Sequence, residues 1–280
     1  MFRDDALQDR VVLVTGGGSG LGLSMAKRMA ALGARIAITG RTEEKLRDAV
    51  GEMGGDEARA YGHPADVRDA ESVGEMVRAV ADHFGRIDVL VNNAAGNFLS
   101  ATEDLSPNGF DAVVRTVLHG SFHASHAVGN LMMEQEGGGS ILNIVTTYAW
   151  TGSAFVVPSA CAKAGVLALT RSLAVEWATY GIRVNAIAPG PFPTPGAWER
   201  LMPTPEIEAE ARARVPAGRF GEHEELANLA CFLVSDASPY ITGECVTIDG
   251  GEWLASGGQF NGFTRRPREE VKAFLRGMRG

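Results

Sequence analysis

Short apolar runs alternate with longer amphipathic stretches along this chain, and this alternation limits the possible folds more than any other feature. The runs VVLV, IDVLV and ILNIV are apolar on both faces, as strands are when helices cover both sides of a parallel sheet. We expect strands at 11–14, 35–39, 87–91, 140–145, 182–187 and 245–248, and another near 58–61. The pattern predicts an α/β fold, a doubly wound parallel sheet with helices on both faces.

No internal repeat or domain boundary interrupts this pattern, so we expect a single domain over residues 1–280. The stretch APGPFPTPGAWERLMPTP (188–205) holds six prolines, too many for a regular element and too apolar for a linker. We interpret about 188–215 as a lid over a site. The end of the chain, about 257–280, is expected to form a basic tail.

Charge and cysteine content exclude several classes of protein. The formal charge of -8 argues against general affinity for nucleic acid or for an anionic membrane, because both require a basic face. Cys161, Cys231 and Cys245 are widely spaced and suit a reducing compartment. The first ten residues carry acids where a signal peptide needs an apolar core, and no stretch approaches ~18 consecutive apolar residues. We therefore expect a cytoplasmic protein with no nucleic-acid or membrane partner.

The turn TGGGSGLG (15–22) follows the first expected strand and leads directly into a helix. This arrangement suits a dinucleotide pyrophosphate, since Gly16 permits the turn, Gly20 lets the backbone approach the phosphates, and Gly22 allows close packing. A merely flexible loop is the weaker alternative. The residues expected to bind the cofactor here are Thr15, Gly16, Ser19, Gly20, Leu21 and Gly22.

Arg41 favours NADP over NAD. An acid about twenty residues after the glycines binds the ribose of NAD, whereas an arginine there accommodates the 2′-phosphate of NADP. This chain has Gly40 and Arg41, and the guanidinium offers a planar fork to a phosphate. A solvated arginine at a strand end is the alternative. Asp66 and Val67 follow a further strand, where the Asp66 carboxylate could accept from the adenine amino group or cap the next helix.

The turn TGGGSGLG, the segment NNAAG (92–96) and the pair Pro189-Gly190 together resemble the short-chain dehydrogenase/reductase family over roughly residues 8–255. The resemblance implies a Rossmann-type domain, a nicotinamide cofactor contacted also by Asn93, Pro189 and Gly190, and a homotetramer. The family's usual catalytic tyrosine stands four residues before a lysine. Here Ser159 stands at that distance before Lys163.

Four further segments resemble the 2,4-dienoyl-CoA reductase branch of that family: NNAAGNF (92–98), FVVPSACAKAG (155–165), the lid, and DGGEW (249–253). In that branch a serine replaces the usual tyrosine, and an earlier tyrosine and an asparagine hold the thioester carbonyl. On this chain those positions are Tyr148 and Asn97. The resemblance therefore implies reduction of 2,4-dienoyl-CoA by NADPH in unsaturated fatty-acid β-oxidation, with trans-3-enoyl-CoA as the expected product.

The residue types suit that chemistry. Hydride addition at the far carbon of the diene moves negative charge to the thioester oxygen, so hydrogen-bond donors aimed at that oxygen matter more than a strong acid. Tyr148 and Asn97 are such donors. Lys163 is expected to bind the nicotinamide ribose with Ser159 beside it, although a serine and a lysine four apart share a helical face by geometry alone. A Ser-Lys hydrolase is disfavoured because its serine stands three residues before the lysine.

Apolar residues near these positions suit an acyl chain, although each alone is as well explained by core packing. The expected substrate contacts are Phe98, Thr146, Trp150, Phe155, Phe192 and Trp198, with Met202 nearby. Thr146 could instead satisfy a loop backbone. His119, His123 and His126 have helical spacing that could hold a metal, but no carboxylate completes the set, and we expect no metal.

Three alternatives stay open from the sequence. The chain could reduce a 3-oxoacyl thioester or a sugar, or it could be a catalytically silent NADP-binding protein. The basic residues of the tail, Arg265, Arg266, Arg268 and Lys272, could contact CoA phosphates, pair with acids of a neighbouring subunit, or stay solvated.

Overall fold

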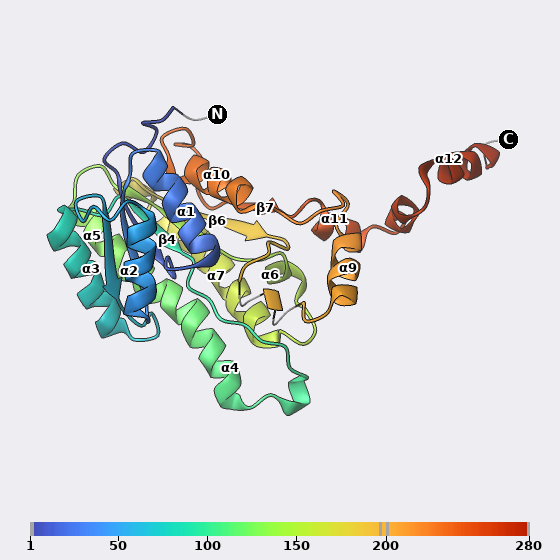
Figure 1. The fold of residues 1–280 in the computed structure, drawn as a ribbon, viewed down its shortest axis with the longest axis horizontal. Coiled ribbons are helices and arrows are strands. Elements are labelled where there is room, and N and C mark those ends of the chain that lie inside the picture. The colour runs from blue at the N-terminus through green and yellow to red at the C-terminus, as the bar shows by residue number, and fades with distance from the viewer. Residues whose placement is uncertain (1–2, 196–197, 200–201, 279–280) are drawn as a thin grey trace.

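A seven-stranded parallel sheet forms the centre of the protein (Figure 1). The computed structural model describes residues 3–195, 198–199 and 202–278. The strand order is β3-β2-β1-β4-β5-β6-β7. The strands are β1 (Val11–Thr15), β2 (Arg35–Gly40), β3 (Ala60–Pro64), β4 (Val89–Asn92), β5 (Gly139–Ile144), β6 (Ile182–Pro189) and β7 (Cys245–Ile248).

Helices cover both faces of the sheet. Side chains of α1 (Gly20–Ala31), α2 (Glu43–Glu52) and α10 (His223–Val234) share one buried core with β1 and β2. Side chains of α3 (Ala70–Phe84), α5 (Gly120–Glu134) and α7 (Val157–Glu176) share a second core on the opposite face. The expected doubly wound α/β fold is therefore confirmed.

Several strand ends differ from those expected from the sequence, at positions where side chains determine where the strand begins or ends. β4 begins two residues later than expected, because Asp88 carries buried hydrogen bonds and Ile87 bonds the Gln135 side chain through its backbone. β3 runs to Pro64 at the edge of the sheet, where proline costs no ladder bond to a further strand. β6 continues through Pro189, paired with Ile248.

The remaining elements are the other helices and helical turns in the described part of the chain. They are η1 (Thr102–Asp104), α4 (Pro107–Val114), the π-helical turn η2 (Arg115–His119), α6 (Tyr148–Thr151), η3 (Ala178–Tyr180), α9 (Pro205–Arg214), α11 (Glu252–Gly257), η4 (Asn261–Arg265) and α12 (Arg268–Gly277). The expected lid region thus includes a regular helix, α9, with the Thr204 hydroxyl at its N-cap. In Figure 1, α12 lies apart from the sheet and its covering helices.

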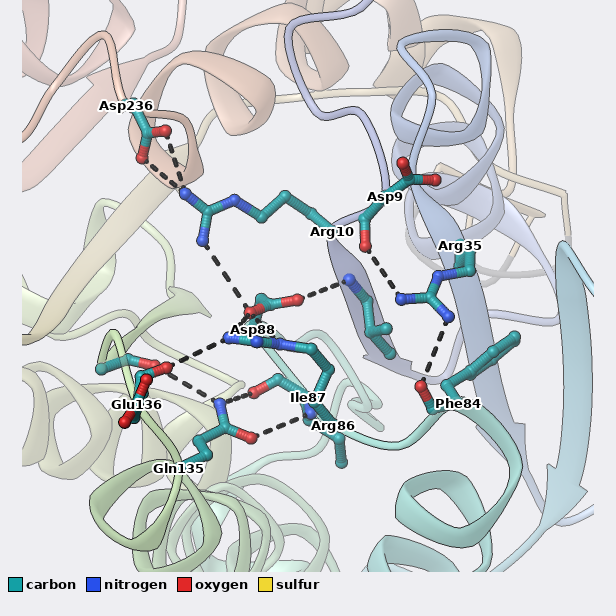
Figure 2. Close-up of polar contacts among 12 residues, drawn as sticks. Asp9, Arg10, Arg35, Phe84, Arg86, Ile87, Asp88, Gln135, Glu136 and Asp236 are labelled. Atoms are coloured by element: carbon teal, nitrogen blue, oxygen red, sulfur yellow. Dashed lines mark hydrogen bonds and ion pairs between the residues drawn. The ribbon is translucent and has the colours of Figure 1, made fainter.

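Asp88 joins the amino ends of β1 and β4 (Figure 2). Its carboxylate is 3% exposed and accepts from the Val11 backbone N–H at 2.9 Å and from Arg86 Nε at 2.8 Å. Arg10 lies 3.8 Å from the same carboxylate and forms a second ion pair with Asp236 at 2.9 Å. This network links the amino ends of β1 and β4, at the end of the strands opposite their carboxyl ends.

In the part of the chain that the structure describes, none of the helices combines the length and the apolar character needed to span a lipid bilayer.

Candidate active site

The glycine-rich turn joins β1 to α1 in the conformation that close ligand approach requires. Gly16 and Gly20 have positive φ angles of 65° and 55°, a region that glycine enters without steric cost. A Cβ atom added to Gly22 would lie 2.5 Å from Asn93 Nδ2. The turn therefore packs tightly against the end of β4, and a side chain at these positions would fill the cradle.

Thr15 ties β1 to β4 beneath this turn. Its hydroxyl accepts hydrogen bonds from the backbone N–H groups of Asn93 and Ala94, both at 3.1 Å. The Asn93 amide in turn donates to the Thr15 and Gly16 carbonyls. Thr15 is 2% exposed, so its side chain holds the loops in place from below. Leu21 packs against the core formed with α1.

A cavity of about 310 Å³ opens beside the turn. The predicted cofactor residues that line it are Gly16, Ser19, Arg41, Asp66, Val67 and Asn93. Three residues that the sequence reasoning missed also line it: Thr42, Lys45 and Arg68. Thr42 and Lys45 belong to the start of α2, so the wall beside Arg41 carries a second cation and a hydroxyl. This set fits an adenosine ribose that carries a 2′-phosphate.

Arg68 holds the Asp66 carboxylate. Its Nε atom donates to both Asp66 carboxylate oxygens, at 2.9 and 3.0 Å. The hydrogen bond from Arg68 lowers the pKa of Asp66, against the opposing effect of burial. Asp69, not Asp66, caps α3, since its side chain accepts from the Glu71 backbone N–H. The helix-capping alternative for Asp66 is therefore wrong.

Tyr148, Ser159 and Asn97 meet at the carboxyl end of β5. The Tyr148 hydroxyl, at the start of α6, lies 2.9 Å from the Ser159 hydroxyl on α7. The Asn97 amide nitrogen, in the loop after β4, lies 3.5 Å from the Tyr148 hydroxyl. Three segments far apart in the sequence thus bring a phenol, an alcohol and a carboxamide together, which is a group of neutral hydrogen-bond donors suited to an oxyanion.

Lys163 lies one helical turn beyond Ser159 on α7. Its side chain is 6% exposed, and its ammonium group donates to the Ile144 carbonyl at the end of β5. Burial lowers the pKa of Lys163 to about 8. The amine is therefore held rigidly beside the catalytic group, with a charge that depends on pH near neutrality.

Two aromatic side chains remain accessible next to this group. Phe98 follows Asn97 directly and is 37% exposed, and Phe155 precedes α7 and is 60% exposed. The Phe155 carbonyl accepts from the Ser100 backbone N–H at 2.9 Å, which joins the two loops. Phe155 has a φ angle of 64°, an uncommon value for a bulky residue. Such strain persists only where the surroundings enforce it.

Other expected substrate residues have neighbours of their own. Trp150 packs on the small core below α6 and α7, and its ring lies 5.5 Å from the ring of Trp253 on α11. Thr146 accepts from the Tyr148 backbone N–H at 3.3 Å, which matches its alternative role in the loop. Trp253, the last residue of the DGGEW segment, therefore lies next to the expected substrate residue Trp150.

The lid residues pack mainly within the protein. Phe192 is buried in the core shared with α1 and α10, so its ring faces the interior. Trp198 contacts the Phe220 ring at 4.7 Å and donates to Glu208 at 3.2 Å. Gly190 lies against Asp249, where an added Cβ would come within 2.6 Å.

His223 connects the lid to the glycine-rich turn, a role that the sequence did not reveal. Its Nε2 atom lies 2.6 Å from the Pro193 carbonyl, and its Nδ1 atom lies 2.8 Å from the Ser24 hydroxyl on α1. Thr194, next in the lid, lies 3.5 Å from the position of a Cβ on Gly20. The lid segment thus begins directly over the turn.

The three histidines at helical spacing do not converge. His123 Nδ1 bonds the Val67 carbonyl at 3.0 Å, and the His119 and His123 ring centres are 6.2 Å apart. His126 lies against the Phe122 ring. Within the described ranges, no group of three metal-binding side chains comes together.

Comparison with known proteins connects this geometry to a family. A family model described as enoyl-(acyl carrier protein) reductase matches residues 16–252. The chain is 47% identical to a Bacillus subtilis (strain 168) protein named probable 2,4-dienoyl-CoA reductase (2E-enoyl-CoA-producing), over 89% of this chain and 98% of that protein. It is 40% identical to the peroxisomal 2,4-dienoyl-CoA reductase (3E-enoyl-CoA-producing) of Arabidopsis thaliana, over 99% and 93%.

A crystal structure of a short chain dehydrogenase from Bacillus anthracis is similar in both sequence and fold. It is 46% identical, with a TM-score of 0.81, and the match covers 90% of this chain and 98% of that one. Taken with the glycine-rich turn and the seven-stranded sheet, these matches show that the chain belongs to the short-chain dehydrogenase/reductase family.

Proposed function

We propose that this protein reduces 2,4-dienoyl-CoA thioesters to enoyl-CoA with NADPH, in the β-oxidation of unsaturated fatty acids. The observation that carries the proposal is that Asn97 and Ser159 both contact the Tyr148 hydroxyl, at 3.5 and 2.9 Å, and that the helix of Ser159 also carries the buried Lys163 one turn later. The position that holds a tyrosine in the usual family signature holds Ser159 instead. The site is therefore better suited to stabilising an oxyanion than to protonating one.

The names of the relatives support the same substrate class. Proteins of bacterial and plant origin named 2,4-dienoyl-CoA reductase are 40–47% identical to this chain over most of its length. The chain carries the asparagine, tyrosine, serine and lysine that the resemblance implies. The acyl-CoA substrate follows from these two observations together.

The proposed reaction proceeds through a dienolate. NADPH, which Arg41 and Lys163 would hold, would supply a hydride for carbon 5 of the diene, and the electron pair of the conjugated system would then move to the thioester oxygen. Tyr148 Oη and Asn97 Nδ2 donate hydrogen bonds to that oxygen and stabilise the charge that develops there. A proton from water then reaches carbon, so the net reaction consumes one hydride and one proton.

Two basic residues are proposed to hold the cofactor at its two ends. Arg41, with Lys45 and Thr42 beside it in the cavity wall, would bind the 2′-phosphate. Lys163 would bind the nicotinamide ribose hydroxyls, and its burial keeps the ammonium group in one position. Ser159 orients the Tyr148 hydroxyl through their 2.9 Å contact.

We propose trans-3-enoyl-CoA as the product. The group at the thioester oxygen contains no strong acid among the residues that contact Tyr148, so protonation is left to solvent. Hydrogen bonds hold the negative charge of the dienolate at the thioester oxygen, and carbon 2 is the basic carbon nearest to that oxygen. Protonation at carbon 2 leaves the double bond at carbon 3. The Bacillus subtilis relative bears the name of a 2E-producing enzyme, so product analysis is decisive.

The test is incubation of the purified protein with NADPH and 2,4-hexadienoyl-CoA. We expect NADPH oxidation at 340 nm and a 3-hexenoyl-CoA product, identified by chromatography against both isomers. Acetoacetyl-CoA is the matched substrate for an ordinary carbonyl reductase. Turnover of acetoacetyl-CoA alone would reject the dienoyl assignment, and tight NADPH binding without turnover of either compound would indicate a catalytically silent protein.

Assembly and location are part of the same proposal. We infer a homotetramer, as is usual in the family, and a cytoplasmic location, which agrees with three free cysteines, two of them buried. Light scattering of the purified protein and fluorescence imaging of a tagged copy test these two points.

A further inference from the structure

The chain ends in a folded arm outside the domain. We call residues 257–280 the arm; the structure describes it to residue 278, and it contains η4 and α12. Figure 1 shows α12 extending away from the sheet and its covering helices. The family model ends at residue 252, so the arm lies outside the part of the chain that matches it.

The arm has packing of its own. The Phe263 ring on η4 lies 5.8 Å from the Phe274 ring on α12, and the Arg266 guanidinium lies 5.7 Å above Phe263. Val271, on the first turn of α12, is 5% exposed. These contacts give the arm a defined shape, which a merely solvated tail would not need.

The arm exposes an apolar surface to solvent. Its exposed members are Phe260, Phe274, Leu275 and Met278, with exposed fractions from 42% to 69%. α12 has ten residues, and isolated helices shorter than ~12–15 residues are only marginally stable in water. Most helical stability comes from packing of the apolar face. The arm therefore requires a partner that covers this surface.

Charge distinguishes between the candidate partners. Residues 257–280 carry six basic and two acidic side chains, a formal charge of +4, so residues 1–256 carry -12. A second copy of the chain carries, outside its own arm, the net negative charge that complements the arm. An anionic membrane would attract the arm and repel the rest of the protein. Identical chains can also exchange arms reciprocally, which covers both apolar surfaces at once.

We propose that the arm docks on a second copy of this chain, through the apolar surface of Phe274, Leu275 and Met278 and through its basic residues. In this proposal the arm is a segment that stabilises the oligomer, and it lies outside residues 16–252, which match the family model. Because the arm is remote from the catalytic group in the fold, the proposal stands or falls separately from the reductase assignment.

The first experiment measures mass. We compare the full-length protein with Phe274→Asp/Leu275→Asp by sedimentation velocity over a range of concentrations, with Tyr240→Asp as the control for an equally apolar, fully exposed site in the domain. We expect the double variant to dissociate at concentrations at least ~10-fold higher than the wild type, with an unchanged far-UV circular dichroism spectrum that shows the domain is still folded. An oligomer whose mass and dissociation are unaltered would overturn the proposal.

The second experiment identifies the partner. A photo-crosslinking amino acid in place of Met278 is expected to join two chains, with the crosslink in the acidic domain of the other copy. Crosslinks confined to one chain would contradict the proposal. Co-sedimentation with phosphatidylserine vesicles tests the alternative partner, an anionic membrane. Vesicle binding that the double variant abolishes, with no change in oligomer mass, would assign the arm to a membrane surface instead.

Discussion

The Tyr148 hydroxyl lies 2.9 Å from the Ser159 hydroxyl, with the two residues on consecutive helices. Ser159 occupies the place four residues before Lys163 that belongs to the catalytic tyrosine in the usual family signature. Tyr148, from a different segment of the chain, thus brings a phenol hydroxyl close to that position. The serine becomes the partner that orients it, and the proposed chemistry follows from this exchange.

Removal of the Tyr148 hydroxyl tests its role directly. We expect Tyr148→Phe to lower kcat for 2,4-hexadienoyl-CoA by about 10²- to 10³-fold, the usual cost of losing one oxyanion donor. NADPH affinity, measured by fluorescence titration, should be retained, because Tyr148 is not among the residues that line the proposed cofactor cavity. Tyr240→Phe, at a fully exposed residue, is the control. Unchanged turnover in Tyr148→Phe would remove this residue from the mechanism.

Arg41 should decide between the two nicotinamide cofactors. We expect Arg41→Ala to weaken NADPH binding by about 10- to 100-fold, since hydrogen bonds to charged groups contribute about 1.5–3 kcal/mol, and to change NADH binding little. Arg47→Ala is the matched control, because Arg47 is exposed on α2, six residues after Arg41, and does not line the cavity. Equal weakening of both cofactors by Arg41→Ala would argue against a phosphate contact.

The buried Lys163 predicts a pH dependence. Burial lowers its pKa to about 8, so the ammonium form is complete well below pH 8 and is lost as the pH rises through that value. If the charged form binds the ribose, the dissociation constant for NADPH should increase between about pH 7 and pH 9. The Lys163→Met variant should bind more weakly and show a flat profile over that range. A wild-type affinity constant from pH 7 to pH 9 would contradict this role.

Asp88 and Asp236 both pair with Arg10 but differ in burial, at 3% and 86% exposure of their side chains. We expect Asp88→Ala to lower the free energy of unfolding by about 2–3 kcal/mol, because the buried Val11 N–H loses its acceptor. Asp236→Ala should cost less than about 1 kcal/mol, as exposed ion pairs do. Urea unfolding of both variants measures the difference, and equal losses would mean that burial does not set the cost.

The fold was predictable because its signals are local. Short, largely apolar runs marked six of the strands within two residues at each end, since strands covered by helices on both faces are rich in apolar side chains. The glycine-rich turn was equally visible, because tight turns and close backbone approach require glycine at particular positions. Only the edge strand β3, with one fully buried position among its five, was poorly located.

Several site residues could not be predicted because their meaning depends on distant partners. His223 contacts Ser24, 199 positions earlier, and nothing in the local sequence indicates that contact. Phe192 was expected at the substrate and lies in the core instead, because an apolar residue in a proline-rich segment carries no sign of which side it faces.

The left-handed backbone of Phe155 places two demands on one position. Glycine there would relieve about 1–2 kcal/mol of steric cost, while the accessible ring beside the catalytic residues would be lost. If Phe155 contacts the acyl chain of the proposed substrate, the stability of this loop and the binding of that chain would favour different amino acids at this position. Glycine would then suit short substrates, whereas long acyl chains would favour the aromatic ring in a less stable loop.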